Sequence, residues 1–253
     1  MKNSPLITVI TVCFNSEEHI ADCINSVNHQ TYEEIEHVFI DGGSTDNTLE
    51  IIQNHAKRNS IIVSEPDRGI YDAMNKGLEF STGEIIGFLN SDDLYSNNNV
   101  LSKIAETFDN SNVDIVHGDL QFINENNEVV RSWKGESYYS GQFARSMSPA
   151  HPTFYCKREV FDKVGRFTLD YKIVGDLEFM FRSLEISKMS SSLISENLVI
   201  MRLGGISTES IYTSWSIYKE VKTFHLSHGV SFNSFVYWRG KFLKFLKQKV
   251  FNR

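Results

Sequence analysis

The sequence predicts an α/β fold with a mostly parallel central sheet flanked by helices. Two observations carry this prediction. Apolar, β-favouring runs alternate with amphipathic helical segments through the first 90 residues, and a polar cluster follows several of those runs. Strands separated by helices pair in parallel through right-handed crossovers. A chain of 253 residues is long enough for one such domain with a small appendage.

The first half has a regular strand–helix order. Each expected strand is rich in Ile, Val and Phe, and each expected helix has apolar residues at helical spacing. Asn15 and Glu18 match a capping box at the start of the first helix. The expected strands cover residues 6–14, 35–40, 61–63 and 84–90, and the expected helices follow residues 15 and 46 and span 70–80.

The second half is less regular, and it contains no internal repeat or low-complexity tract. Two apolar runs flank a polar segment there, as in a β-hairpin. The expected elements are a strand over 113–118, a hairpin of 120–123 and 129–133, a long loop or short helix over 134–150, a strand over 151–155, and helices over 159–164 and 173–182.

The net charge of −7 is unevenly distributed. Residues 231–253 contain six Lys and Arg and no acid, which leaves 19 cations against 32 acids in the rest of the chain. A body this acidic is a poor binder of nucleic acid, so no nucleic-acid partner is expected. Three cysteines without CxxC spacing support neither a disulfide nor a zinc site. No stretch approaches about 18 continuous apolar residues and no signal-peptide cleavage pattern is present, so a cytoplasmic protein is expected.

The basic tail also contains aromatic residues. Its apolar residues recur at steps of three and four, a pattern typical of a helix that lies in an anionic membrane surface. The alternative is a helix that packs on the body with its basic side in water. The apolar residues concerned are Phe235, Trp238, Phe242, Phe245 and Leu246.

The expected strand 84–90 ends abruptly in residues 90–93 (Asn-Ser-Asp-Asp). Ligands of open α/β sheets bind at the carboxyl ends of the strands. Asp92 and Asp93 repel each other there unless a cation or a hydrogen-bond donor compensates, and a divalent ion shared with a diphosphate would do so. The alternative is that these residues only cap the following helix.

Five motifs follow the predicted elements in order: Phe14-Asn15, residues 41–46 (Asp-Gly-Gly-Ser-Thr-Asp), residues 67–77 (Asp-Arg-Gly-Ile-Tyr-Asp-Ala-Met-Asn-Lys-Gly), residues 90–93 and Gly175-Asp176. Together they resemble the family 2 glycosyltransferases, which are inverting enzymes of the GT-A fold that use nucleotide-diphosphate sugars. The segment 67–77 is similar to that of a subgroup that builds bacterial surface polysaccharides of the colanic-acid and O-antigen type. The usual Asp-x-Asp triplet is altered, because Asn90 holds its first position.

The resemblance covers residues 5–208 and implies a domain organisation. A GT-A glycosyltransferase domain is expected over 1–208, with a nucleotide-sugar-binding half (1–118) and a smaller acceptor-binding half (119–208). A C-terminal helical tail is expected over 209–253.

The resemblance also implies donor-binding roles. Asp41 would accept a hydrogen bond from a base N–H of the nucleotide, expected to be UDP, and an Asx turn is the alternative. Arg68 would meet the diphosphate or the base, since a guanidinium matches phosphate oxygens, and a solvated loop arginine is the alternative. Arg202 would clamp the diphosphate from a flexible lid hinged at Gly204 and Gly205.

The catalytic roles follow from the same resemblance. Asp93 is assigned to a divalent ion, Mn²⁺ or Mg²⁺, that bridges both phosphates, and Asp92 to the ribose hydroxyls or the same ion. Asp176 matches the catalytic base, which takes the proton of the acceptor hydroxyl, and a structural N-cap is the alternative. His151 is expected to shape the acceptor site or touch the sugar, or else to be structural.

The implied function is transfer of one sugar from a UDP-sugar to a hydroxyl of a glycan or lipid-linked acceptor in surface polysaccharide (lipopolysaccharide) synthesis. Trp215 lies outside a QxxRW-type motif, which favours single transfer over polymerisation. A lipid-linked acceptor would place the enzyme peripherally on the inner face of the cytoplasmic membrane, and a homodimer is left open. The alternatives are a sugar-1-phosphate nucleotidyltransferase and a catalytically inactive transferase-like scaffold.

Overall fold

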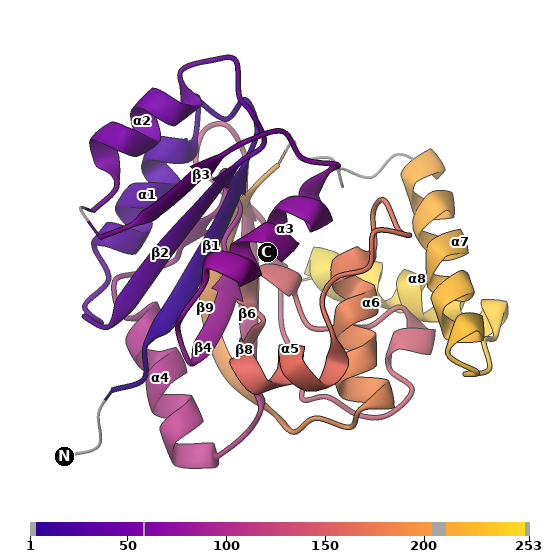
Figure 1. Cartoon of the computed structure of the whole chain (residues 1–253). Helices are drawn as coiled ribbons and strands as arrows, with labels where there is room; N and C mark the ends of the chain where they lie inside the picture. Colours follow the sequence, from indigo (N-terminus) through magenta and orange to yellow (C-terminus); the bar gives the residue numbers. More distant parts are fainter. Residues whose placement is uncertain (1–3, 58, 204–210, 251–253) are drawn as a thin grey trace.

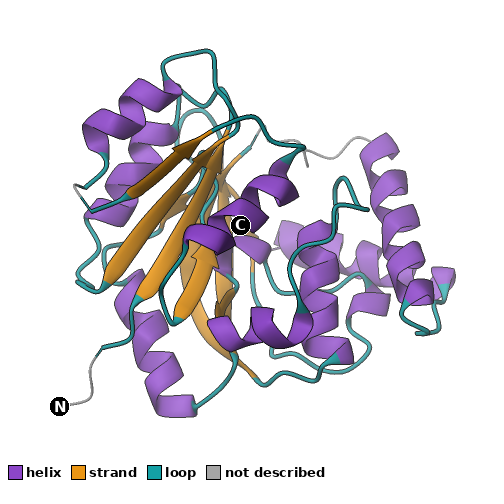
Figure 2. Ribbon diagram, in the orientation of Figure 1, coloured by secondary structure: helices purple, strands orange, loops and turns teal. Residues whose placement is uncertain are grey.

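The computed structural model describes residues 4–57, 59–203 and 211–250, and it confirms the mixed α/β architecture (Figures 1 and 2). The strands of the described residues form one sheet in the order β3-β2-β1-β4-β8-β6-β9-β5, with β7 paired to β6. The strands are β1 (Ile7–Cys13), β2 (Ile35–Asp41), β3 (Ile61–Ser64), β4 (Ile85–Phe88), β5 (Leu94–Tyr95), β6 (Ile115–Ile123), β7 (Val129–Trp133), β8 (Tyr155–Lys157) and β9 (Ser191–Arg202).

The helices cover both faces of this sheet, as Figure 1 shows. Short 3₁₀ helices and a π-helical turn occur only in the second half of the described chain. The helices are α1 (Ile20–Asn28), α2 (Thr48–His55), α3 (Ile70–Phe80), α4 (Val100–Ser111), α5 (Arg158–Val164), α6 (Gly175–Phe181), α7 (Ile211–Ser227) and α8 (Ser234–Val250), with 3₁₀ turns η1 (Phe143–Arg145) and η2 (His151–Thr153) and the π-turn η3 (Arg182–Ile186).

The first half forms as the alternating pattern predicts. β3, β2, β1 and β4 pair in parallel, and every residue of β1 is buried. Side chains of a strand alternate between the two faces, so Val9 packs in the cluster that includes α1 and α4, while Ile10 packs in the cluster that includes α3. Cys13 pairs in register with Asp41, and Asp41 with Ser64. The ends of these three strands therefore lie side by side.

One glycine in α3 sets how closely that helix approaches the sheet. A Cβ atom on Gly77 would collide with the Ile10 side chain of β1. Glycine is the only residue that permits this close packing. The tight contact brings the N-terminal end of α3, with Arg68 and Tyr71, close to the carboxyl ends of the strands.

Beyond β4 the structure departs from the predictions, which included neither β5 nor α4. The predicted hairpin is present as the antiparallel pair β6–β7. The strand predicted over 151–155 is wrong in position, since η2 occupies His151–Thr153 and β8 begins at Tyr155. The 12-residue strand β9 was not predicted, because its mixed sequence lacks a clear period of two. β8 runs antiparallel to β4 and β6, so the sheet is mixed beyond β4.

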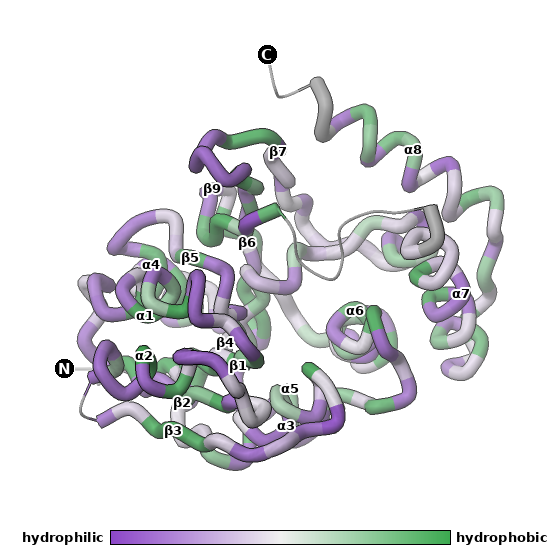
Figure 3. The backbone as a smooth tube through the Cα atoms, turned by 90° about the horizontal axis from the view of Figure 1, so that it is seen from above, coloured by the Kyte–Doolittle hydropathy of each residue, from purple (hydrophilic) through white to green (hydrophobic). Residues whose placement is uncertain are grey.

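The described part of the tail is helical and packs on the body. Phe224 of α7 is fully buried, with its ring centroid 4.9 Å from that of Phe181, and Tyr237 of α8 is 2% exposed. A Cβ atom on Gly240 would collide with the backbone of Arg145, so α8 lies directly against η1. Figure 3 shows α7 and α8 on the side of the molecule opposite α1 and α2. Within the described residues, no helix has the length and apolarity needed to cross a membrane.

Candidate active site

Asp41 ends β2, and its carboxylate is completely buried. Oδ2 accepts a hydrogen bond from the Ser64 hydroxyl at 2.6 Å and from the Ser44 N–H at 3.1 Å, and Oδ1 accepts from the Ser44 hydroxyl. Both oxygens are therefore engaged by the protein. The contact of Asp41 with a nucleotide base stays a prediction, and in this structure the side chain orders the loop that begins at Gly42.

An exposed aromatic ring lies next to this loop. The ring of Phe14, the residue that follows β1, is 61% exposed. A Cβ atom on Gly42 would lie 2.5 Å from Asp67 Oδ2 and 3.5 Å from the Phe14 ring, so these two side chains flank the glycine. An exposed aromatic ring directly after a buried strand was the sequence signal for this surface.

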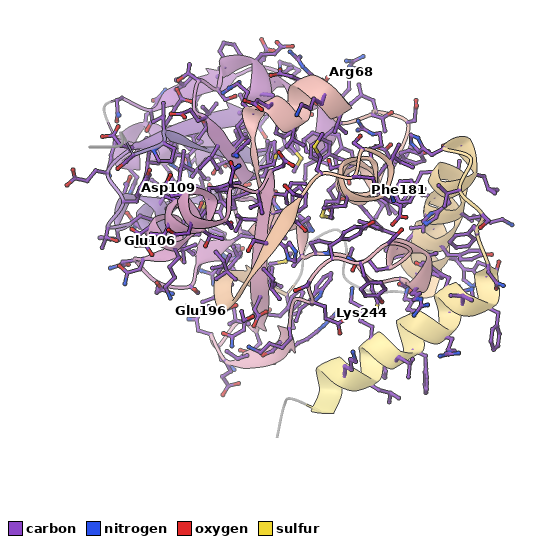
Figure 4. The ribbon with its side chains drawn as sticks, turned by 90° about the horizontal axis from the view of Figure 1, so that it is seen from below. Arg68, Glu106, Asp109, Phe181, Glu196 and Lys244 are labelled. Carbon is purple, nitrogen blue, oxygen red and sulfur yellow. The ribbon has the colours of Figure 1, made fainter. Side chains whose placement is uncertain are left out.

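Arg68 lies two residues before α3, and Figure 4 shows it at the edge of the molecule. Its side chain is 76% exposed and its Nη2 donates to Asp72 Oδ1 at 2.9 Å. Lys76 pairs with Glu65 at 2.7 Å. Arg68 therefore lies near the loop that follows β2, since its neighbour Asp67 contacts Gly42, and it pairs with an acid in the first turn of α3.

Asp93, three residues beyond Asn90, is a second completely buried acid of the site. It has no exposed surface, and Asn90 Nδ2 donates to its Oδ2 at 3.2 Å. Burial and the neighbouring Asp92 raise the pKa of Asp93 well above its usual value, and Arg202 acts in the opposite direction. Asp92 is half-buried. An acid held in this state is typical of a functional site.

Two oxygen atoms at this place have no hydrogen-bond partner. They are Asp93 Oδ1 and Asn90 Oδ1, both buried. Buried polar atoms are normally paired, and carboxylate and amide oxygens are ligands that Mg²⁺ and Mn²⁺ accept. No cluster of three His, Cys, Asp or Glu side chains able to hold a metal occurs among the described residues. The two orphaned oxygens fit a cation whose remaining ligands come from elsewhere.

Arg202 is not on a lid. It is the last residue of β9, and its Nη2 donates to Asp22 Oδ2 of α1 at 2.7 Å. The predicted lid position is wrong because residues 191–202 form a strand paired with β6. The predicted hinges Gly204 and Gly205 lie outside the described residues. Arg202 Nε is buried without a partner, and its charge acts on Asp93, so the guanidinium belongs to the acidic cluster at the end of β4.

Asp176 lies in the first turn of α6, and its carboxylate is 21% exposed. The Tyr71 hydroxyl lies 3.0 Å from Oδ1, and His151 Nδ1 lies 3.2 Å from Oδ2. The structure therefore brings the predicted base and the predicted acceptor residue together, although 25 positions separate them in sequence. Tyr71 was missed as a site residue, because its place on the buried face of α3 indicates core packing alone.

The site combines acids at the carboxyl ends of β2 and β4 with a partly exposed carboxylate, that of Asp176, from the second half of the chain. This arrangement is typical of an α/β enzyme that transfers a chemical group. The chain belongs to glycosyl transferase family 2, whose profile matches residues 8–169. It is therefore a glycosyltransferase, and the nucleotidyltransferase alternative is not supported.

Characterised and solved relatives agree with this assignment. A PGL/p-HBAD biosynthesis glycosyltransferase of Mycobacterium bovis is 29% identical over 187 residues, covering 71% of this chain and 70% of the relative. Glycosyltransferase AglE of Haloferax volcanii is 27% identical over 190 residues, covering 72% and 62%.

Two solved structures have the same GT-A fold. S. aureus TarS 1–349 superposes with a TM-score of 0.64 at 20% identity, covering 87% of this chain and 65% of that one. The mannosyltransferase PcManGT of Pyrobaculum calidifontis gives a TM-score of 0.61 at 19% identity, covering 86% and 61%. This chain thus spans less than two thirds of AglE and of both solved chains.

Proposed function

We propose that the protein transfers a single sugar, with inversion, from a UDP-sugar to a hydroxyl of a glycan or lipid-linked acceptor in the synthesis of a surface polysaccharide. The observation that carries the proposal is the pair of buried, unpartnered oxygens on Asp93 and Asn90 at the carboxyl end of β4. Such atoms call for a ligand, and a metal-bound diphosphate supplies what they lack. TarS has been solved with UDP and with UDP-GlcNAc, and PcManGT with GDP-Man and Mn²⁺, which supports a nucleotide-sugar donor.

The nucleotide would lie along the ends of β1 and β2. We place the base against the exposed ring of Phe14, where Gly42 leaves room and Asp67 offers a carboxylate to a base N–H. Asp41 supports this surface through Ser44, and it would reach the base itself only after exchanging its hydroxyl partners. Arg68 would exchange Asp72 for the phosphates or the base.

At the diphosphate, Asp93 would hold Mn²⁺ or Mg²⁺, with Asp92 on the ribose or the same ion. A divalent cation there would neutralise the charge that builds on the departing UDP. Arg202, already beside this cluster, adds a permanent positive charge. Asp176 would take the proton of the acceptor hydroxyl as that oxygen bonds to the anomeric carbon and the bond to UDP breaks.

Calorimetric titration tests the donor site directly. We expect UDP to bind in the presence of Mn²⁺ more tightly than GDP or dTDP, and Phe14→Ala to weaken UDP binding about tenfold, since base–aromatic stacking contributes about 1–3 kcal/mol. Phe80→Ala is the matched control, because Phe80 is 43% exposed at the far end of α3. Equal affinity of both variants for UDP would contradict the placement of the base, and no binding of any nucleoside diphosphate would contradict the proposed function.

The outer face of α8 suits attachment to a membrane. Arg239 lies exposed beside its exposed apolar residues, whereas Lys244 faces the body over the Trp133 ring, as its position in Figure 4 indicates, and Lys247 pairs with Glu136 of the body at 2.7 Å. A lipid-linked acceptor would be met at such a surface. The exposed apolar side chains of α8 are Phe235, Phe242, Leu243, Phe245 and Leu246.

Vesicle flotation tests this attachment. We expect the protein to float with vesicles that contain anionic phosphatidylglycerol, and less with neutral phosphatidylcholine or at high salt. Glu in place of Phe242 and Phe245 should abolish flotation without loss of stability, because both rings are exposed. The control is Phe80→Glu, which lies away from α8. Flotation that survives the double substitution would exclude α8 as the attachment site.

A further inference from the structure

Each oxygen of the Asp176 carboxylate has its own side-chain neighbour. The Tyr71 hydroxyl lies 3.0 Å from Oδ1 and His151 Nδ1 lies 3.2 Å from Oδ2. The two neighbours come from different halves of the chain, since Tyr71 is on α3 and His151 is on η2. A carboxylate gripped at both oxygens cannot rotate about its Cβ–Cγ bond without losing a contact.

The Tyr71 hydroxyl is built in rigidly. The side chain is 7% exposed, and its ring packs so closely on α6 that a Cβ atom on Gly175 would lie 2.7 Å from it. The hydroxyl also lies 2.7 Å from the carbonyl oxygen of Ile173. Burial and the neighbouring Asp176 raise the pKa of Tyr71 far above its usual value. The hydroxyl thus keeps its proton, and that single hydrogen is shared between the carbonyl oxygen of Ile173 and Asp176 Oδ1.

His151 is the more accessible of the two neighbours, with a side chain 32% exposed. It starts η2, whose Thr153 is completely buried and exchanges hydrogen bonds with the backbone of Gly118 on β6. The turn that carries the imidazole is therefore anchored in the sheet. Nδ1 can donate to Asp176 in the neutral Nδ1–H tautomer and in the imidazolium form alike.

We propose that Tyr71 and His151 are positioning residues that fix the plane of the Asp176 carboxylate, with its free lone pairs directed to the acceptor hydroxyl. This inference rests on the proposed role of Asp176 as the base. His151 would then contact the catalytic base and not the acceptor. A fixed orientation of the base favours proton transfer.

Few other charges face this carboxylate. Glu178, on the same helix, is directed to Arg182 at 2.7 Å and His228 at 3.0 Å. From α7, Glu220 accepts hydrogen bonds from the backbone N–H groups just before α6. The side chains that line the small pocket behind Asp176 are otherwise apolar: Met74, Phe88, Phe154, Cys156, Phe161, Phe167, Phe179 and Met180. Within the described residues, Tyr71 and His151 are therefore the two side chains found in polar contact with the Asp176 carboxylate.

Carbon-13 NMR of the Asp side-chain carboxyls tests the proposal without any substrate. Asp176→Asn assigns the resonance, whose chemical shift and line width are then compared in the parent protein, Tyr71→Phe, His151→Ala and His151→Asn. We expect the Asp176 resonance to shift and broaden in Tyr71→Phe and in His151→Ala, since each variant loses a neighbour that fixes the carboxylate. His151→Asn, whose amide can replace Nδ1–H, should restore most of the difference. Tyr139→Phe, an exposed tyrosine on another loop, is the control and should leave the resonance unchanged.

Kinetics supply the second measurement. UDP release from the donor should slow about tenfold in Tyr71→Phe and His151→Ala, with UDP affinity unchanged, because the base is no longer held in one orientation. Unchanged Asp176 resonances in both variants would overturn the proposal, as would a His151→Ala variant that only raises the acceptor KM. Failure of the proposed function gives a different result: Asp176→Asn would then keep full turnover, while the Asp176 resonance still shifts in Tyr71→Phe and His151→Ala.

Discussion

Replacing Asp176 by Asn is expected to lower turnover about 10³-fold and to leave UDP affinity unchanged within about twofold. The amide keeps the size of the side chain and can still bond to Tyr71 and His151, but it cannot accept a proton at neutral pH. Single-turnover kinetics with a UDP-sugar and calorimetry with UDP and Mn²⁺ measure the two quantities separately. A loss in turnover alone identifies a group that acts in the transition state.

The matched control is Asp170→Asn. Asp170 is an exposed carboxylate in the loop before α6. Within the described residues, the one hydrogen bond found for its side chain comes from the Thr168 hydroxyl. Its removal should change turnover less than about twofold. If Asp176→Asn reduced UDP affinity and turnover equally, Asp176 would be a structural residue and the proposed mechanism would be wrong.

Asp93→Asn is expected to abolish activity and at the same time to stabilise the ligand-free protein. The raised pKa of Asp93 means that at neutral pH the unfolded chain releases this proton more readily than the folded chain. Stability from this group is therefore complete below about pH 4 and falls as pH rises towards the folded-state pKa. Asn does not ionise, so the variant should melt about 2–4 °C higher at pH 7 for each kcal/mol recovered.

The same substitution should lower turnover at least about 100-fold and remove the effect of Mn²⁺ on UDP affinity, because it takes away a metal ligand. Thermal unfolding at pH 4 and pH 7, with and without UDP and Mn²⁺, measures both consequences. The gain in melting temperature should vanish at pH 4, where the carboxyl is protonated in both states. A variant that still responds to Mn²⁺ as the parent does would exclude Asp93 as a ligand.

The sequence predicts the first half of the fold well because local and global signals agree there. Every strand from β1 to β4 is an apolar run, and β1, β2 and β3 are each followed by a helix with one apolar face. The second half mixes antiparallel and parallel pairs, and the pairing of β6 with β8 and β9 joins segments far apart in sequence. No local pattern specifies such pairings, so β9 was missed and Arg202 was placed on a lid.

The site shows the same division. The acids at the strand ends could be predicted because these charged residues directly follow buried apolar runs. The contacts of Asp176 could not be predicted, because its partner Tyr71 lies 105 residues away in sequence and the contact depends on how closely α3 and α6 pack. The hydrogen bonds that Ser44 and Ser64 donate to Asp41 could likewise not be predicted, because they depend on which residues lie close together in the folded chain.

One contact links the tail to the chemistry. Glu220 of α7 accepts the N–H groups of Ile173 and Val174 at 3.2 and 3.1 Å, and these residues lead directly into the turn that carries Asp176. A chain shortened at residue 208 would thus lose more than the proposed membrane-attachment surface. The backbone beneath the base would be left with unsatisfied donors, and a soluble fragment made for convenience would be a slow enzyme even on a water-soluble acceptor.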